Sequence, residues 1–361
     1  MDEVIKGLTD LQPTSPRIQP VILPSDTPEQ KPFVAMLNGT ATNQLISLNS
    51  STTQPVIDAI TGNATIEQGT LKVFIDSYNE LTGGLRVSTS KLLDACTIAL
   101  TEANRYRGAD SELKPTVTIP LDRFMELCGV PSTKASKDKM RCKVKEDLDT
   151  LYHISMEWTE NSGKKQRDFA KMRICEKVGI IRGNITLSFS MDMARYLTNA
   201  YLMQYPVEIL KLDERNANIY PLGRKLLLHN SIDNNRRKGT ANIISVTSLL
   251  AVCPTIPTYG QVMSTGRQLE QRIKAPFENA LNALPFICWE YSNSKGVALT
   301  DEQLAATDYK TFTELYILFE VIDAPDQTAR LQARADEARA RAEKKKRTTS
   351  KKKKPADDTP E

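Results

Sequence analysis

The chain has 361 residues, which is long enough for two domains of ordinary size with tails. Its 48 Lys and Arg and 44 Asp and Glu residues give a formal net charge of +4. Residues 325–361 hold 12 of the basic and 7 of the acidic side chains, so this tail carries +5 and the remainder −1. No segment approaches the roughly 20 apolar residues of a membrane span, and the N-terminus has no signal-peptide pattern. We therefore expect a cytoplasmic protein without a membrane partner.

The first 68 residues are rich in Pro, Ser, Thr, Gln and Asn and have little periodicity. We predict a disordered N-terminal extension over residues 1–68, with a short ordered piece around Phe33–Leu37. Order is predicted to begin with a strand over Thr70–Ser77, where alternate residues are apolar. A helix should follow over Ser90–Asn104, and a short strand over Thr116–Ile119.

The chain then contains one helix-to-strand pattern twice. In both copies the spacing of apolar residues changes from that of a helix to that of a strand at the same position, which marks a helix that leads into a strand. A short apolar helix precedes each copy, at 120–128 and at 245–253. The repeated residues are Leu148, Leu151, Ile154 and Met156 in the first copy and Leu281, Leu284, Ile287 and Trp289 in the second, at a constant offset of 133.

A short helix, a turn, a longer basic helix and a β-hairpin together make a winged helix-turn-helix, a unit that places its longer helix in the major groove of DNA. We therefore predict an α+β protein with two tandem winged helix-turn-helix domains. The first domain should span residues 69–199, with wing strands over 154–158, 169–178 and 185–189 and turns at Ser162–Lys165 and Arg182–Asn184. The second should span 200–324, and residues 325–361 should form a basic tail.

The longer helix of each unit is predicted to face DNA with the side opposite its apolar stripe. In the first unit that side carries lysines, which are typical of phosphate contacts. In the second unit it carries Arg and Gln, which can pair with guanine and adenine edges. The predicted DNA-binding residues are Lys134, Lys139, Arg141 and Lys145 of the first helix, Lys164 and Lys165 of its wing, Arg267, Gln268, Gln271, Arg272 and Lys274 of the second helix, and Arg236, Arg237 and Lys238 of a basic loop.

Two further elements are predicted in the second unit. A long helix should run from about Glu214 to Asn230, in which Pro221 either causes a kink or lies near the true start. The longer helix that carries the Arg and Gln residues should run over Gly266–Leu284.

The motifs of the common enzyme classes are not found in the sequence. There is no Gly-x-x-x-x-Gly-Lys-Ser/Thr loop for ATP, and the two histidines, His153 and His229, form no metal-binding pair. The six cysteines form no Cys-x-x-Cys pair and are predicted to be buried thiols in a reducing compartment. We expect a non-enzymatic protein without cofactor or metal.

The chain resembles the replication-initiator proteins of plasmids and other bacterial mobile elements, which contain two tandem winged-helix domains. The resemblance covers about residues 70–322 and rests on the duplicated unit, on Ile185–Leu197 (ITLSFSMDMARYL) and on Ile219–Leu226 (IYPLGRKL). It implies binding of double-stranded DNA at repeated origin sites, opening of the duplex and recruitment of host replication proteins. It also implies self-association, with a dimer that represses its own promoter and a monomer that binds the origin in the bacterial cytoplasm, on the nucleoid.

Two other functions fit the same residues. A winged-helix transcription regulator without a role in replication would have the same pattern. A winged-helix protein-interaction module would share the fold but would have no salt-sensitive affinity for DNA. The basic clusters at 344–347 and 351–354 should attract phosphates without distinguishing bases.

Overall fold

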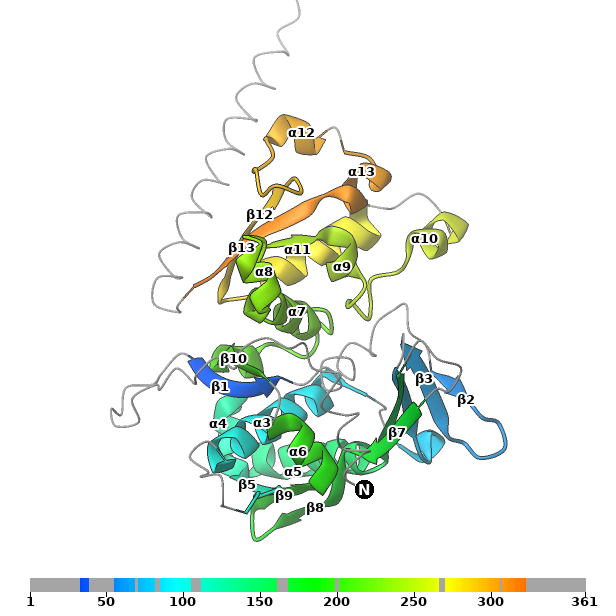
Figure 1. Ribbon diagram of the computed structural model, residues 1–361, viewed down its shortest axis with the longest axis vertical. Helices are drawn as coiled ribbons and strands as arrows, with labels where there is room; N and C mark the ends of the chain where they lie inside the picture. The colour runs from blue at the N-terminus through cyan, green and yellow to red at the C-terminus, as the bar shows by residue number, and fades with distance from the viewer. Residues whose placement is uncertain are drawn as a thin grey trace, which may run out of the picture.

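The structure, a computed structural model, describes residues 33–38, 55–68, 71–81, 85–104, 112–160, 168–198, 201–265, 270–305 and 307–322. Figure 1 shows two α+β units that lie one above the other. There are two clusters of buried apolar side chains, the first running from Ala64 to Leu197 and the second from Met203 to Phe319, which also includes Val87 of the first unit. Among the described residues no helix is both long and apolar enough to cross a bilayer.

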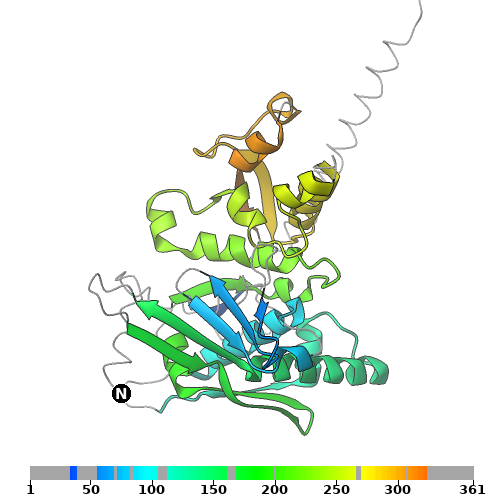
Figure 2. The ribbon, with the colours of Figure 1, turned by 90° about the vertical axis from the view of Figure 1, so that its right-hand side faces the viewer.

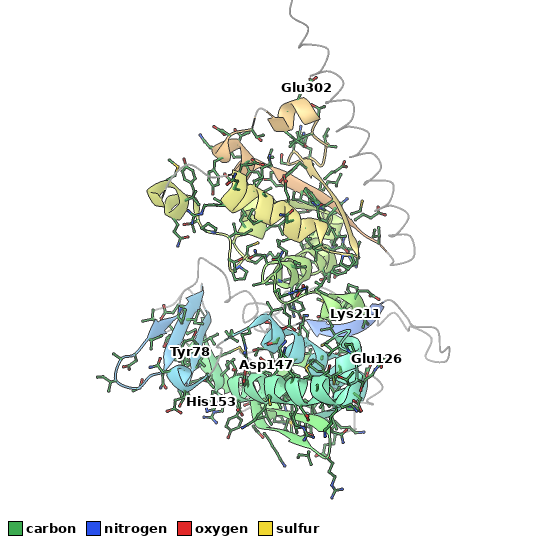
Figure 3. The ribbon with its side chains drawn as sticks, turned by 180° about the vertical axis from the view of Figure 1, so that it is seen from behind. Tyr78, Glu126, Asp147, His153, Lys211 and Glu302 are labelled. Atoms are coloured by element: carbon green, nitrogen blue, oxygen red, sulfur yellow. The ribbon has the colours of Figure 1, made fainter. Side chains whose placement is uncertain are left out.

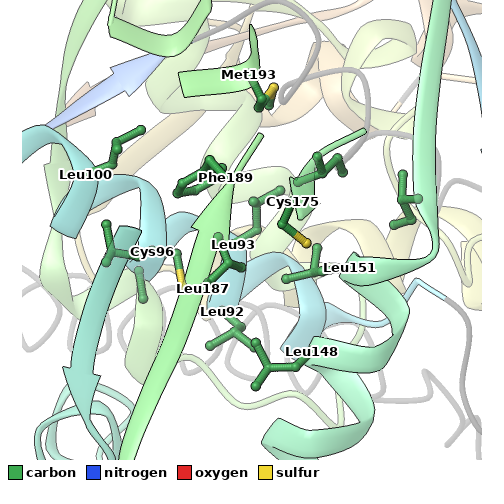
Figure 4. Packing of buried hydrophobic residues seen from close by; sticks show 14 of the residues in the cluster. Leu92, Leu93, Cys96, Leu100, Leu148, Leu151, Cys175, Leu187, Phe189 and Met193 are labelled. Carbon is green, nitrogen blue, oxygen red and sulfur yellow. The ribbon is translucent and has the colours of Figure 1, made fainter. Parts of the chain in front are cut away.

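The first unit contains a winged helix-turn-helix. Its three-stranded antiparallel sheet has the order β5-β9-β8. Figure 4 shows how Leu92 and Leu93 of the first helix pack with Leu148 and Leu151 of the longest one and with Phe189 of the central strand. The elements are α3 (Val87–Asn104), β5 (Thr116–Pro120), α4 (Leu121–Leu127), α5 (Lys134–Tyr152), β8 (Cys175–Ile181), β9 (Asn184–Phe189) and α6 (Met191–Thr198).

The first unit has a second, five-stranded sheet, and it contains strands that were predicted to form the wing. The strand that follows α5 pairs with β4 and β7 and not with β8 or β9, so it belongs to this sheet and not to the winged-helix sheet. The prediction that the wing begins with this strand is therefore wrong. The sheet has the order β2-β3-β4-β6-β7, formed by β2 (Val56–Ile57), β3 (Ala64–Gln68), β4 (Leu71–Ile75), β6 (Ile154–Glu160) and β7 (Asp168–Arg173), with the short helix η1 (Tyr78–Glu80) after β4.

Order also begins earlier than predicted. Strands β2 and β3 lie within the segment 1–68 that was predicted to be disordered, and Ala64 and Ile66 are buried in the first core. These two residues alternate with polar ones, which is a strand pattern that the composition of the segment concealed. The predicted ordered piece near Phe33 is strand β1 (Phe33–Asn38), which pairs antiparallel with β10 (Tyr201–Pro206).

The second unit repeats the winged-helix topology. Its sheet has the order β11-β13-β12, which places the last strand in the middle as in the first unit. The elements are η2 (Val207–Lys211), α7 (Ile219–Ser231), α8 (Asp233–Arg237), β11 (Ile243–Ser245), α9 (Val246–Leu250), α10 (Tyr259–Thr265), η3 (Glu270–Lys274), α11 (Ala275–Asn282), β12 (Ile287–Ser292), α12 (Asp301–Ala305), α13 (Tyr309–Glu314) and β13 (Tyr316–Val321).

Two predicted helices of this unit have different bounds in the structure. Helix α7 begins at Ile219, so Pro221 lies in its first turn, where its missing N–H costs nothing. Of the predicted helix over Gly266–Leu284, the structure describes a continuous helical segment from Glu270 to Asn282, whose first turn, η3, is π-helical before α11 begins at Ala275. Pro276 accounts for the π-helical turn, since it has no N–H to bond to the carbonyl four residues earlier.

Candidate nucleic-acid interface

Helix α5 presents an exposed basic face. Thr133 caps the helix by accepting a hydrogen bond from the Ser136 N–H at 3.2 Å. Lys134, Arg141 and Lys145 are exposed, and their separations of about two and three turns place them on one side. Within the part of the chain that the structure describes, none of these three side chains forms an ion pair. Lys139 is exposed on the flank, so all four predicted positions are accessible to a phosphate.

Two acidic residues of α5, Glu146 and Asp147, face away from this basic face, whereas Asp138 is exposed one turn after Lys134 on the same side. Asp147 is buried and accepts hydrogen bonds from Ser88 Oγ at 2.9 Å and Thr89 Oγ1 at 2.7 Å, both on α3 (Figure 3). Burial raises the pKa of Asp147, although the two hydroxyls oppose the shift. Glu146 is bonded to Arg86 at 2.7 Å. These contacts hold α5 against α3 and leave its outer face with a positive charge.

The wing of the first unit is the β8–β9 hairpin, which packs beside α5 (Figure 2). Its two central residues are Arg182 (φ 50°) and Gly183 (φ 80°), the pair of positive φ angles that a tight hairpin of right-handed twist requires. The turn was predicted at this place, but Arg182 was not among the predicted DNA-binding residues. Its side chain is exposed at the tip, next to Ile181, which is half exposed.

The predicted wing residues Lys164 and Lys165 lie outside the described residues. The strands on either side of them, β6 and β7, belong to the five-stranded sheet. Their assignment to the winged-helix hairpin is therefore wrong. The signal that distinguishes the true wing is the Arg-Gly pair, because β-hairpins of two loop residues favour glycine at such a position.

In the second unit the structure places three of the five predicted helix residues. Gln271 is exposed, Arg272 is half-buried, and Lys274 is paired with Glu270 at 3.6 Å. All three lie on the π-helical turn η3, directly before α11. Arg267 and Gln268 lie outside the described residues. Gln271 is therefore the most accessible of the three placed residues for reading a base edge.

The predicted basic loop of this unit lies away from the wing. Arg236, Arg237 and Lys238 are exposed on α8 and at its C-terminal end. This segment leads into β11 at Ile243, which pairs with Leu318, whereas the β12–β13 connection begins beyond Ser292, opposite Tyr316. The structure therefore puts the loop at the end of the sheet opposite the wing, and it does not join these three residues to Gln271.

The histidine at the end of α7 fixes the basic loop. His229 Nε2 lies 2.8 Å from the Ile243 carbonyl and 3.0 Å from that of Thr240, so the proton on this nitrogen is donated to the loop backbone. Asn235 Nδ2 donates to His229 Nδ1 at 3.2 Å. His229 thus has a structural role.

The cysteines differ in exposure. Burial raises the pKa of Cys175 to about 12 and that of Cys128 to about 11. Cys96 and Cys253 are also buried, as predicted, but Cys142 is exposed on α5 between the basic side chains. The described residues include no cluster of His, Cys, Asp or Glu that could hold a metal ion.

Comparison with known proteins identifies the first unit. Residues 75–211 match the family described as initiator replication protein, WH1. Two crystal structures of domains 2 and 3 of RctB align at 9% and 8% identity, over 74% and 77% of this chain and 91% and 94% of theirs, with TM-scores of 0.37 and 0.32. TM-scores this low do not contribute to the family assignment. No curated protein matches the chain. The family match confirms the predicted resemblance to replication initiators, and a winged-helix domain of that kind, over residues 75–211.

Proposed function

The chain carries the WH1 domain of the initiator replication proteins over residues 75–211, and on this basis we propose that it binds duplex DNA at repeated origin sites to initiate replication of a plasmid or other mobile element. The observation that carries the proposal is the exposed face of α5, which combines Lys134, Arg141 and Lys145 with a wing tip at Arg182. A second winged-helix unit of the same strand order supports contacts at two places on one duplex.

The two units have different roles in this proposal. The lysines of α5 neutralise phosphates and position the protein, while Gln271 reads a base edge in the second contact. Arg182 extends from the hairpin tip toward the adjacent minor groove. Binding requires no nucleotide, metal or bond-breaking step, and the protein is not an enzyme. In the bacterial cytoplasm it self-associates and recruits host replication proteins, and its dimer represses its own promoter.

Selection of DNA fragments by the purified protein tests this function. We expect short repeated sequences, and we expect that a small plasmid carrying them together with the gene replicates. Specific binding without such replication would favour a transcription regulator. Absence of salt-sensitive DNA binding would leave a protein-interaction module.

Cys142 offers a direct probe of the face. Because Cys142 is exposed and the other five cysteines are buried or half-buried, it should react first with a thiol reagent, and the selected duplex should slow that reaction. The Gln271→Ala variant should keep this protection but relax base preference, by about 1–3 kcal/mol at the contacted position. Equal reactivity of Cys142 with and without DNA would show that α5 does not face the duplex.

Replacing Arg182 by glycine should weaken DNA binding without lowering stability. Arg182 has a left-handed backbone that costs an L-residue roughly 1–2 kcal/mol, so glycine should leave stability unchanged or raise it by up to about 1 kcal/mol. The salt slope of binding should fall by about one unit, as for one lost phosphate contact. Denaturation in urea and titration at several salt concentrations measure the two effects. The matched control is Arg195→Ala on α6, which removes a charge outside the face. If the control lowers the slope as much as Arg182→Gly does, the wing has no specific contact.

A further inference from the structure

A buried group of polar side chains joins the two units. Asp94 lies on α3 of the first unit, Tyr205 on β10, and Tyr220 and Arg224 on α7 of the second unit. All four residues are almost completely buried. We call them the Asp94 cluster. The first helix of one winged-helix unit thus contacts the first helix of the other through charged groups.

The side chains of the Asp94 cluster are joined by hydrogen bonds that converge on the Asp94 carboxylate. Arg224 donates through Nε to Oδ2 of Asp94 at 2.7 Å and through Nη2 to Oδ1 at 2.9 Å, which is a two-point contact. Tyr220 and Tyr205 donate to Oδ2 at 2.5 and 3.1 Å, and their oxygens lie 3.0 Å apart. Burial, followed by the charge of Asp94, raises the pKa of both tyrosines well above its ordinary value, so both stay neutral donors.

A second polar contact between the units lies nearby. Lys91 of α3 is buried, donates to the Leu212 carbonyl at 2.5 Å and lies 3.4 Å from Glu214. Glu214 also pairs with Lys143, which belongs to α5. The segment that enters the second unit is therefore held by two helices of the first, one of which carries the basic face.

The two segments proposed to face DNA are α5 and the turn before α11. Each is packed against a helix that the Asp94 cluster joins, α5 against α3 and α11 against α7. On the first side, Asp147 anchors α5 to α3. On the second side, Gly223 of α7 lies so close to the residues after α11 that a Cβ there would be 2.8 Å from Leu284 Cδ2 and 3.2 Å from Phe286 Cζ. A continuous path of buried contacts thus connects α5 to α11.

A buried ion pair is seldom the most stabilising way to fill a core, because desolvation offsets most of its attraction. Two apolar side chains would pack with comparable stability in several slightly different orientations. The carboxylate, guanidinium and two hydroxyls satisfy one another in one arrangement only. The distinctive effect of these four polar side chains is therefore on the relative orientation of the helices that carry them.

We infer that the Asp94 cluster fixes the two winged-helix units in one relative orientation and so makes the protein select DNA by the spacing between its two contact sites. This selection rests on the proposed function, whereas the fixed orientation does not. A duplex whose two sites are rotated by half a helical turn could be bound by only one unit at a time, and the gain from simultaneous binding would be lost.

The orientation is tested first without DNA. Spin labels are placed on Cys142 of α5 and on Asn279→Cys of α11, both exposed positions, with the half-buried Cys128 and Cys288 replaced by alanine. The test variant is Asp94→Leu with Arg224→Met, which removes both charges and fills the space, so that folding is preserved. We expect the distance distribution between the labels to broaden about twofold or more in the variant.

The matched control is Tyr291→Phe. It removes a buried tyrosine hydroxyl that donates to Glu278 at 3.0 Å, but within the second unit alone. The control should keep the narrow distribution. Tyr205→Phe with Tyr220→Phe keeps the ion pair and should give an intermediate width. If the distance distribution of the variant lacking both charges is as narrow as that of the wild type, the inference is overturned.

The spacing is tested with the selected fragment and a copy that carries about 5 extra base pairs, half a helical turn, between the two protected regions. The wild type should bind the longer fragment about 100-fold more weakly, whereas the double variant should lose less than about tenfold. Equal binding of both fragments by the wild type would refute selection by spacing. If the wild type selects no sequence, the proposed function fails, and the label distances still decide whether the cluster fixes the orientation.

Discussion

Replacing Asp94 by alanine is expected to lower the free energy of unfolding by about 3–5 kcal/mol, because Arg224 would remain charged and buried without its partner. The two tyrosine hydroxyls would lose their acceptor as well. Urea denaturation followed by circular dichroism measures the change. The double variant Asp94→Leu with Arg224→Met leaves no unpaired charge, so it should lose much less stability than Asp94→Ala, with only the two tyrosine hydroxyls deprived of their acceptor. A loss below about 1 kcal/mol for Asp94→Ala would mean that water or another group replaces the carboxylate.

Removing the basic face of α5 should give the largest change in DNA binding. The triple variant Lys134→Ala, Arg141→Ala and Lys145→Ala deletes exposed charges that make no ion pair in the described part of the chain, so folding should be unaffected. Affinity for the selected and for random duplex should fall together, on the order of 100-fold at low salt, and the salt slope should fall by about three units.

The control for this triple variant has the same loss of charge at other exposed positions, Lys114→Ala, Arg195→Ala and Lys211→Ala. It should show a much smaller loss, because distant charges act only through the screened field. Fluorescence anisotropy over a range of salt concentrations measures both variants. Equal losses in the two triple variants would mean that total charge, and not the α5 face, determines affinity.

The elements predicted well are those specified by neighbouring residues. Helix α5 has its cap at Thr133 and a regular apolar stripe, and the Arg182–Gly183 turn contains the glycine that such a turn requires. The basic face of α5 follows from the same spacing and was therefore predicted as well. The π-helical turn before α11 could have been predicted too, because Pro276 lies within the predicted helix.

The pairing of strands could not be predicted in the same way. Strands β6 and β12 follow their helices with nearly the same apolar pattern, yet β6 pairs with both β7, which follows it, and β4, which precedes α3, while β12 pairs with β13. Alternation of side chains shows that one face of a strand is buried but not which strand lies beside it. The wing was misplaced for this reason.

The Asp94 cluster could not have been predicted from the sequence alone. Asp94 is one polar residue in a helix, and its partners are separated from it by 111 to 130 residues along the chain. Carboxylates in helices usually face water, and only the contact with α7 makes this one buried.

The pairing of β1 with β10 has a consequence for the order in which the protein can fold during synthesis. Residues 33–38 leave the ribosome early, but their partner strand is at 201–206, beyond the first winged-helix unit. At roughly 5–20 residues per second, the first strand waits about 8–34 seconds for its partner. During that time its backbone hydrogen-bonding groups remain open to other strands. The first unit can therefore build its own core on the ribosome, whereas the sheet that borders the second unit closes only when the chain has entered that unit.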